Sequence, residues 1–183
     1  MVTDVLNPEN WVIALVCLLG WKSDGLAGVC WGLLVGLFAA ILPVLFVQYG
    51  IRHWQWTSRN VGVRRERLAA LGFIVASDAA GVLTLLVLRA PRAMTGYLAA
   101  MLVTSAVITA ITFAWKISVH CVVASATVAL VALTYDTVVL LGFALVALVA
   151  WSRVRLRAHT TAQVIAGALL GAAAGALAFL AVS

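Results

Sequence analysis

The chain has 183 residues, of which 65% are hydrophobic and only 10% are charged. Soluble domains carry about 25% charged residues, so this composition excludes an ordinary soluble domain and predicts one integral membrane domain over residues 1–183. The formal net charge is +6. Because lysine and arginine beside membrane spans set topology or contact lipid phosphates, we expect the lipid bilayer as a partner and no nucleic acid.

Seven apolar stretches follow one another along the chain, and several reach the ~20 residues that cross a hydrocarbon core of ~30 Å as a helix. They cover residues 11–20, 26–49, 68–88, 95–114, 118–134, 138–151 and 161–182. The first is short, so it either crosses in part or is extended by its flanks. We therefore predict an all-α fold, a polytopic transmembrane bundle of about six or seven segments, with N-terminal spans in residues 1–50 and a core in residues 52–183.

Small residues are frequent in these stretches, which suits close helix packing in lipid. The last stretch carries Gly167, Gly171 and Gly175 at four-residue spacing. We interpret this stripe as a packing surface for another helix of the same chain rather than as a dimer motif.

Three polar stretches lie between pairs of apolar ones, at residues 52–67, 116–120 and 152–163. Two predicted spans separate each polar stretch from the next, so all three must face the same side of the membrane. That side holds nine of the twelve lysines and arginines and all three histidines, His53, His120 and His159. The positive-inside rule predicts that this basic face is cytoplasmic, in a bacterial-type cytoplasmic membrane.

Histidines, arginines and a serine thus meet at one membrane face. Arginine forks suit phosphate oxygens, and one histidine can attack phosphorus while a second protonates the leaving oxygen. The sequence contains neither a glycine-rich phosphate loop nor a cluster of metal-binding carboxylates. We therefore expect chemistry without a metal or another cofactor on a lipid phosphate or diphosphate, whose tail lies in the bilayer.

These polar stretches resemble the three signatures of the type 2 phosphatidic acid phosphatase (PAP2) superfamily. Ser152-Arg153, followed after five residues by His159, is similar to the third signature, Ser-Arg-x5-His-x3-Asp. Residues 117–120, Ile-Ser-Val-His, resemble the second signature, Pro-Ser-Gly-His. Asn60-x6-Arg67-Leu68 resembles the first, Lys-x6-Arg-Pro, so that the resemblance covers roughly residues 52–182.

The resemblance implies an enzyme that removes phosphate from phosphatidic acid, isoprenoid diphosphates and related lipids. His159 would be the nucleophile that forms a phosphohistidine, and His120 would be the general acid. Phosphate-binding roles are implied for residues at or beside the signature positions: Arg67, Arg153, Ser118, Lys116, Asn60 and Arg64.

The chain departs from the signatures at several positions. Gln163 stands where the family has the aspartate that orients the nucleophilic histidine. Its carbonyl can accept a hydrogen bond, but it cannot stabilise an imidazolium by charge; a comparable loss in a serine protease triad costs on the order of 10⁴ in turnover. Asn60 replaces the first-signature lysine, and Ile117 and Val119 replace proline and glycine. The phosphate-binding half of the site is therefore better supported than the hydrolytic half.

Asp78 lies near the middle of the stretch 68–88, where a carboxylate costs on the order of 2.5–3.5 kcal/mol on insertion scales. It is either a neutral or hydrogen-bonded packing residue, or a catalytic proton donor or carboxylate that faces a cationic intermediate.

Three functions remain open from the sequence. The first is a lipid or isoprenoid (di)phosphate phosphatase. The second is a membrane terpene synthase or lyase that ionises an isoprenoid diphosphate and releases pyrophosphate. The third is a non-catalytic protein that binds lipid phosphates. The sequence makes no prediction of the oligomeric state.

Overall fold

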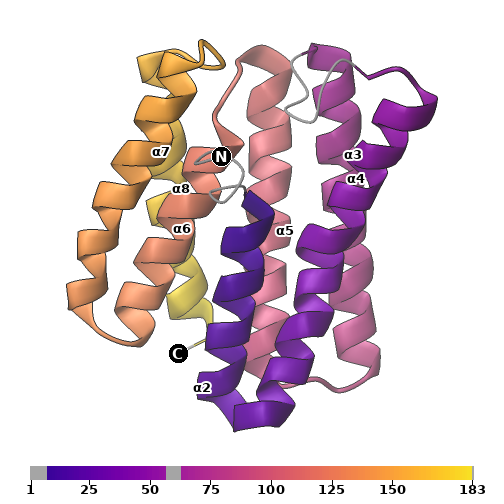
Figure 1. Cartoon of the computed structure of the whole chain (residues 1–183). Helices are drawn as coiled ribbons and strands as arrows, with labels where there is room; N and C mark the ends of the chain where they lie inside the picture. Colours follow the sequence, from indigo (N-terminus) through magenta and orange to yellow (C-terminus); the bar gives the residue numbers. More distant parts are fainter. Residues whose placement is uncertain (1–7, 57–62, 183) are drawn as a thin grey trace.

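The computed structural model describes residues 8–56 and 63–182. These residues form helices, with no β-strand among them. The elements are α2 (Pro8–Gly36), η1 (Leu37–Ile41), α3 (Leu42–His53), α4 (Arg64–Val87), α5 (Arg92–Ala114), α6 (Val119–Thr134), η2 (Thr137–Gly142), α7 (Phe143–Arg155) and α8 (Thr161–Val182) (Figure 1). The predicted all-α class is confirmed.

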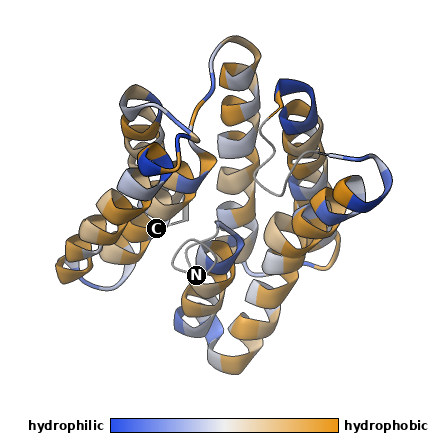
Figure 2. Ribbon diagram, turned by 45° about the horizontal axis from the view of Figure 1, so that its top comes forward, coloured by the Kyte–Doolittle hydropathy of each residue, from blue (hydrophilic) through white to orange (hydrophobic). Residues whose placement is uncertain are grey.

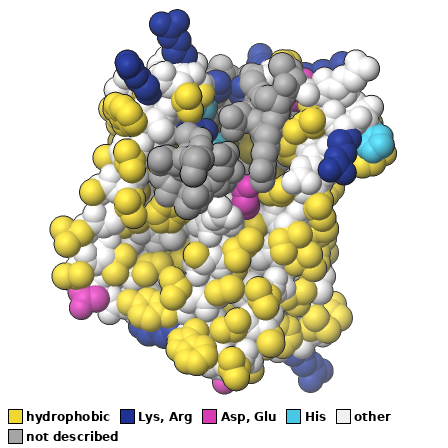
Figure 3. Space-filling view, in the orientation of Figure 1, with side chains coloured by type: hydrophobic (Ala, Val, Ile, Leu, Met, Phe, Trp, Pro, Cys, Tyr) yellow, Lys and Arg dark blue, Asp and Glu magenta, His cyan; other side chains and the backbone are white. Residues whose placement is uncertain are grey.

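Five helical stretches among the described residues are long and apolar enough to cross a membrane. They are Pro8–His53, Arg64–Val87, Arg92–Ala114, Thr137–Arg155 and Thr161–Leu180. Their outer surface is apolar: Leu26, Val87 and Leu141 are each more than 75% exposed, and apolar side chains cover most of the visible face below the basic end (Figure 3). Figure 2 shows hydrophilic residues concentrated near helix ends. The fold fits an integral membrane protein, while the number of six or seven segments stays a prediction.

The first of these stretches is a hairpin of two packed helical arms. Its backbone leaves the helical region at Asp24 and Gly25, where Gly25 has a φ of 52°, and the chain reverses there (Figure 1, bottom). A Cβ atom on Gly28 would lie 1.9 Å from the carbonyl oxygen of Gly20, and one on Gly32 would lie 2.3 Å from that of Val16. Only glycine therefore permits this close approach of the two backbones.

A π-helical turn interrupts the second arm of the hairpin. The turn is η1, and it ends at Ile41, two residues before Pro43 in the first turn of α3. Proline lacks the N–H for an i→i−4 bond and clashes with the carbonyl four residues earlier, which explains a widened turn at this place. The Ser77 hydroxyl of α4 donates to the carbonyl oxygen of Phe38 at 2.6 Å and so satisfies one acceptor in the turn.

Helices α6 and α8 pack through the glycine stripe. A Cβ atom would lie 2.7 Å from the carbonyl oxygen of Ser118 if placed on Gly167, and 2.4 Å from that of Ala126 if placed on Gly175. A Cβ atom on Gly171 would lie 2.1 Å from the carbonyl oxygen of Val122. The interpretation of this stripe as an intramolecular packing surface is confirmed.

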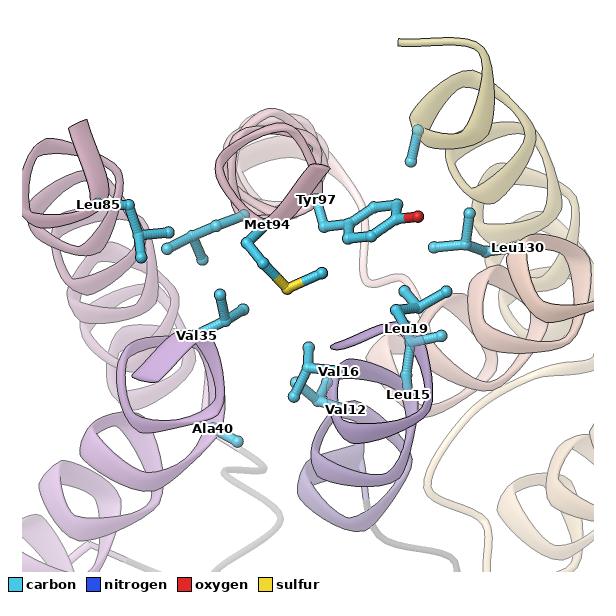
Figure 4. Packing of buried hydrophobic residues seen from close by; sticks show 12 residues of the cluster. Val12, Leu15, Val16, Leu19, Val35, Ala40, Leu85, Met94, Tyr97 and Leu130 are labelled. Atoms are coloured by element: carbon cyan, nitrogen blue, oxygen red, sulfur yellow. The ribbon is translucent and has the colours of Figure 1, made fainter. Parts of the chain in front are cut away.

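A buried apolar cluster joins the hairpin to the other helices (Figure 4). Val16 and Leu19 of α2 face Met94 of α5, and Leu130 of α6 closes the cluster (Figure 4). These four side chains are at most 4% exposed. This packing fixes the first arm of α2 between α5 and α6.

The largest differences from the predicted helix bounds occur at the first and sixth apolar stretches. The first arm of α2 begins at Pro8, a residue suited to the first helical turn, and continues to the turn at Asp24. The stretch predicted at 138–151 starts as the 3₁₀ turn η2, capped by the Asp136 carboxylate, and becomes α7 only at Phe143. Helix α7 extends past the apolar residues to Arg155, because cations are favourable in a last turn.

Candidate functional site

The described residues of the three predicted polar stretches lie at one end of the bundle. The ends of α3, α5 and α7 and the starts of α4, α6 and α8 all lie there (top of Figure 1). Helix α6 has 16 residues, so it extends about 24 Å, less than the hydrocarbon thickness. Trp115 and Ser118 have an extended backbone. They belong to the connection that leads the chain from the end of α5 down to the start of α6. The prediction that the three stretches share one side is confirmed.

A cavity of about 500 Å³ begins among these polar residues and continues between the helices. We call its polar end the mouth, and its lining there includes Arg67, Lys116, His120, Arg153 and His159. The rest, which we call the inner wall, is formed mostly by apolar side chains of α2 to α6 and α8. One space therefore joins a cationic mouth to an apolar interior.

His159 and Gln163 form the pair on which the nucleophile prediction depends. His159 Nδ1 lies 3.3 Å from Gln163 Oε1, and the backbone N–H of Thr160 donates to the same atom at 3.2 Å. Because a backbone N–H can only donate, the atom that it meets must be the amide oxygen. His159 Nδ1 must then carry a proton, and in the neutral ring Nε2 keeps its lone pair.

The start of helix α8 holds this pair in place. Thr160 directly precedes α8, and its hydroxyl accepts a hydrogen bond from the backbone N–H of Gln163 at 3.4 Å. Together with the bond from Thr160 N–H to the Gln163 side chain, this is a capping box, in which threonine and glutamine satisfy each other's backbone donors. The orientation of Gln163 is thus set by local sequence, and the ring of His159 is oriented through it.

His159 is neutral at physiological pH. Burial is the largest cause that lowers its pKa, from the ordinary 6.5 to about 4, and the charge of Lys116 comes next. The hydrogen bond to Gln163 opposes this shift, while the charges of Arg67 and Arg153 add to it. A neutral imidazole with a free Nε2 is the form that can act as a nucleophile.

Arg153 is a buried cation at the mouth. Its side chain is 3% exposed, and Nη1 lies 3.3 Å from His120 Nε2. Since a guanidinium only donates, His120 Nε2 accepts this bond and carries no proton there. Arg153 Nε has no hydrogen-bond partner among the described residues. A buried cation with an unused donor is costly unless an anion completes the site.

Lys116 connects two of the polar stretches. Its ammonium group donates to the carbonyl oxygen of Ala158, so it holds the α5–α6 connection against the residues that precede His159. Burial, followed by the charge of Arg67, lowers the pKa of Lys116. Arg67, on the first turns of α4, is partly buried and lines the same mouth.

The other candidate phosphate-binding residues lie elsewhere. Ser118 is fully buried, its hydroxyl points to Cys121 Sγ at 3.3 Å, and its backbone N–H donates to the carbonyl oxygen of Gln163. Its contacts make it a support between α6 and α8. Arg64 is exposed at the start of α4, and Asn60 lies outside the described residues.

Asp78 lines the cavity deep in the membrane rather than at the mouth. It follows Arg67 on the same continuous helix α4, at a distance of about 16 Å along the axis. A side chain at this depth can meet the tail of a bound lipid phosphate but not its phosphate.

The sequence also left some lining residues unassigned. Arg157 lines the cavity with a φ of 53°, and Glu9 and Thr127 line it as well. Arg157 lies inside the third signature, among the five variable residues between Arg153 and His159, and could have been singled out there. Neither Glu9 nor Thr127 belongs to a recognisable pattern.

No protein-family model, no curated protein and no solved structure matches this chain. The resemblance to the PAP2 superfamily therefore stays a prediction that depends on the signature residues. Among the described residues, no group of three histidine, cysteine, aspartate or glutamate side chains could hold a metal ion.

Proposed function

We propose that this protein is a phosphatase of the PAP2 type that acts on lipid or isoprenoid phosphates and diphosphates. The phosphate head binds at the mouth, and the tail occupies the cavity behind it. The observation that carries this proposal is the pair of bonds to Gln163 Oε1, which leaves a free lone pair on Nε2 of a neutral His159.

In the first step, His159 Nε2 attacks phosphorus and the bond to the leaving oxygen breaks, which gives a phosphohistidine. Arg153 and Arg67 bind the phosphoryl oxygens, and Lys116 adds positive charge beside them. Fixed donors directed at developing charge are the largest source of rate in such reactions. Water then attacks the phosphohistidine and releases orthophosphate.

His120 is the candidate proton donor for the leaving oxygen. Its Nε2 accepts a hydrogen bond from Arg153 Nη1 at 3.3 Å. A bound phosphate attracts the guanidinium and, as an anion, favours protonation of the imidazole that Arg153 has left. Substrate binding thus prepares His120 to act as an acid.

Trapping of the phosphoenzyme tests this proposal. Purified protein is incubated with ³²P-labelled farnesyl diphosphate or phosphatidic acid, quenched in alkali, and assayed for bound label and free phosphate. We expect His159→Ala to abolish the label and to lower phosphate release by on the order of 10⁴ or more. His53→Ala is the control, because His53 is exposed on α3 and stacks on Tyr49. Full activity of His159→Ala would exclude the nucleophile assignment.

A second candidate is ionisation of an isoprenoid diphosphate. The mouth can bind a diphosphate, the apolar inner wall can enclose a carbocation, and Gln163 supplies no charge to assist hydrolysis. Farnesyl and geranylgeranyl diphosphate distinguish the two reactions. Orthophosphate with the plain isoprenoid products supports the phosphatase, and pyrophosphate with a cyclic or rearranged product supports the synthase. Retention of lipid without turnover indicates a binding protein.

We also propose that the basic end faces the cytoplasm of a bacterial-type cell, because lysine and arginine are enriched on that side of membrane proteins. Cysteines introduced one at a time in place of Arg155 and Lys22, which lie at opposite ends of the bundle, test this orientation in a protein whose Cys17, Cys30 and Cys121 are replaced by alanine. A membrane-impermeant thiol reagent on intact cells should label the residue 22 variant and leave the residue 155 variant unlabelled.

A further inference from the structure

The inner wall contains polar groups that the chemistry at the mouth does not use. They are the side chains of Asp78 on α4, Ser105 on α5 and Thr127 on α6, which we call the inner polar site. All three line the cavity, and all three are at most 7% exposed. Buried polar atoms in an apolar wall are expected to have hydrogen-bond partners.

Asp78 has one satisfied and one unsatisfied oxygen. The Ser105 hydroxyl lies 2.9 Å from Oδ2, while Oδ1 has no hydrogen-bond partner among the described residues. The side chain is 1% exposed. Oδ1 is therefore a buried acceptor without a donor, on a residue of the cavity wall, and leaving it unpaired costs free energy.

Thr127 also has an unsatisfied polar atom, unlike five other threonines of the apolar helices. The hydroxyls of Thr84, Thr104, Thr109, Thr112 and Thr134 each donate to the carbonyl oxygen four residues earlier. Thr127 Oγ1 has no hydrogen-bond partner within the described part of the chain. Thr104 also lines the cavity, so two threonines of the same wall can be compared directly, one satisfied and one not.

We propose that the inner polar site binds a hydroxyl group on the tail of the lipid phosphate whose head is held at the mouth. A hydroxyl can donate to Asp78 or accept from Thr127, whereas a saturated tail leaves both groups without partners. The favoured substrates are then lipid phosphates hydroxylated about 16 Å from the phosphate, the separation of Arg67 and Asp78 along α4. This inference rests on the proposed function for the position of the head.

The preference should be large enough to measure. Sites built to bond a hydroxyl discriminate against analogues that lack it, because their buried polar groups are then left unpaired. We expect the correctly hydroxylated tail to bind at least roughly tenfold more tightly than the saturated one.

The test uses octadecyl phosphate and a series of hydroxyoctadecyl phosphates that differ only in the position of the hydroxyl. Equilibrium binding is measured with His159→Ala protein in lipid nanodiscs, so that the result does not depend on turnover. We expect one mid-chain isomer to bind more tightly than both octadecyl phosphate and the isomers hydroxylated near either end. Equal affinity across the series would show that water satisfies the site and would overturn the proposal.

Three variants locate the effect. Asp78→Leu and Thr127→Val, each combined with His159→Ala, should reduce the preference, and the first should remove it. Thr104→Val is the matched control and should keep it, because its hydroxyl already has a partner. A preference that survives in Asp78→Leu would also overturn the proposal. Phosphate release from octadecyl phosphate by the protein with His159 intact tests the proposed function separately.

Discussion

The mouth and the inner wall of the cavity share helices α4 and α6 but are built in different ways. The mouth residues lie at helix ends or in connections, close to other polar residues, and His159 is oriented by the first turn of α8. Asp78 of the inner wall lies in mid-helix and depends on Ser105 of the neighbouring helix. Local sequence can thus orient a residue at the mouth, whereas a polar group in the inner wall acquires its surroundings only through helix packing.

The strongest test of this difference is the removal of Arg153. In Arg153→Met we expect kcat/KM for phosphate release to fall by about 10²–10³-fold, as for the loss of one donor to developing charge. The same change should raise the melting temperature, because it removes a buried cation with an unsatisfied Nε. Arg64→Met, at the exposed start of α4, is the control. A fall in activity together with a fall in melting temperature would indicate a structural role instead.

Variants of Gln163 test whether local sequence orients the nucleophile. Gln163→Leu removes the acceptor for His159 Nδ1 and should lower kcat by on the order of 10²-fold or more, because the ring loses its tautomer control. Gln163→Glu keeps the capping box and adds a charge that stabilises the imidazolium, so kcat should rise above that of the natural protein. Single-turnover rates of phosphoenzyme formation measure both effects. Equal rates in the two variants would contradict the assigned role.

The inner wall can be changed without altering the mouth. Ala100 of α5 lines the cavity, and Ala100→Phe should raise KM for octadecyl phosphate by roughly tenfold through overpacking. Hexyl phosphate, whose tail is too short to reach that depth, should keep its KM. Ala110→Phe places the same side chain on an exposed position of α5 and serves as control. An equal loss for both substrates would mean that the two parts of the cavity are not separable.

The smallest expected effect concerns the pH dependence of stability. The pKa of His159 is about 4 in the folded protein and about 6.5 when the chain is unfolded. Between these values the unfolded chain binds a proton that the folded protein does not, so stability falls as the pH is lowered from 6.5 to 4. The melting temperature in detergent should decrease less over this range for His159→Gln than for the natural protein. Parallel curves would show that His159 is not desolvated.

The parts of the site that the sequence could predict are those in which local pattern decides. Counting the predicted spans between the polar stretches placed His120 and His159 at one face, because an even number of crossings returns the chain to the same side. Gln163 was singled out only by the resemblance, because it stands at the position of the third-signature aspartate, and the structure shows that its Oε1 lies 3.3 Å from His159 Nδ1. Ser118 shows the limit of such reasoning, since its hydroxyl and amide are engaged between α6 and α8 and no signature reveals that packing. Arg157 lines the cavity although it stands at a variable position of the third signature.

The sequence by itself determined an all-helical membrane protein, the order of its apolar stretches and its basic end, because these depend on composition and on near neighbours along the chain. Only the tertiary structure decided that Arg153 meets His120, that the mouth continues into one cavity, and that Asp78 and Thr127 are buried in its wall with unsatisfied atoms. These features depend on distances between helices. Such distances follow from glycine contacts and side-chain packing across the bundle, which no local pattern specifies.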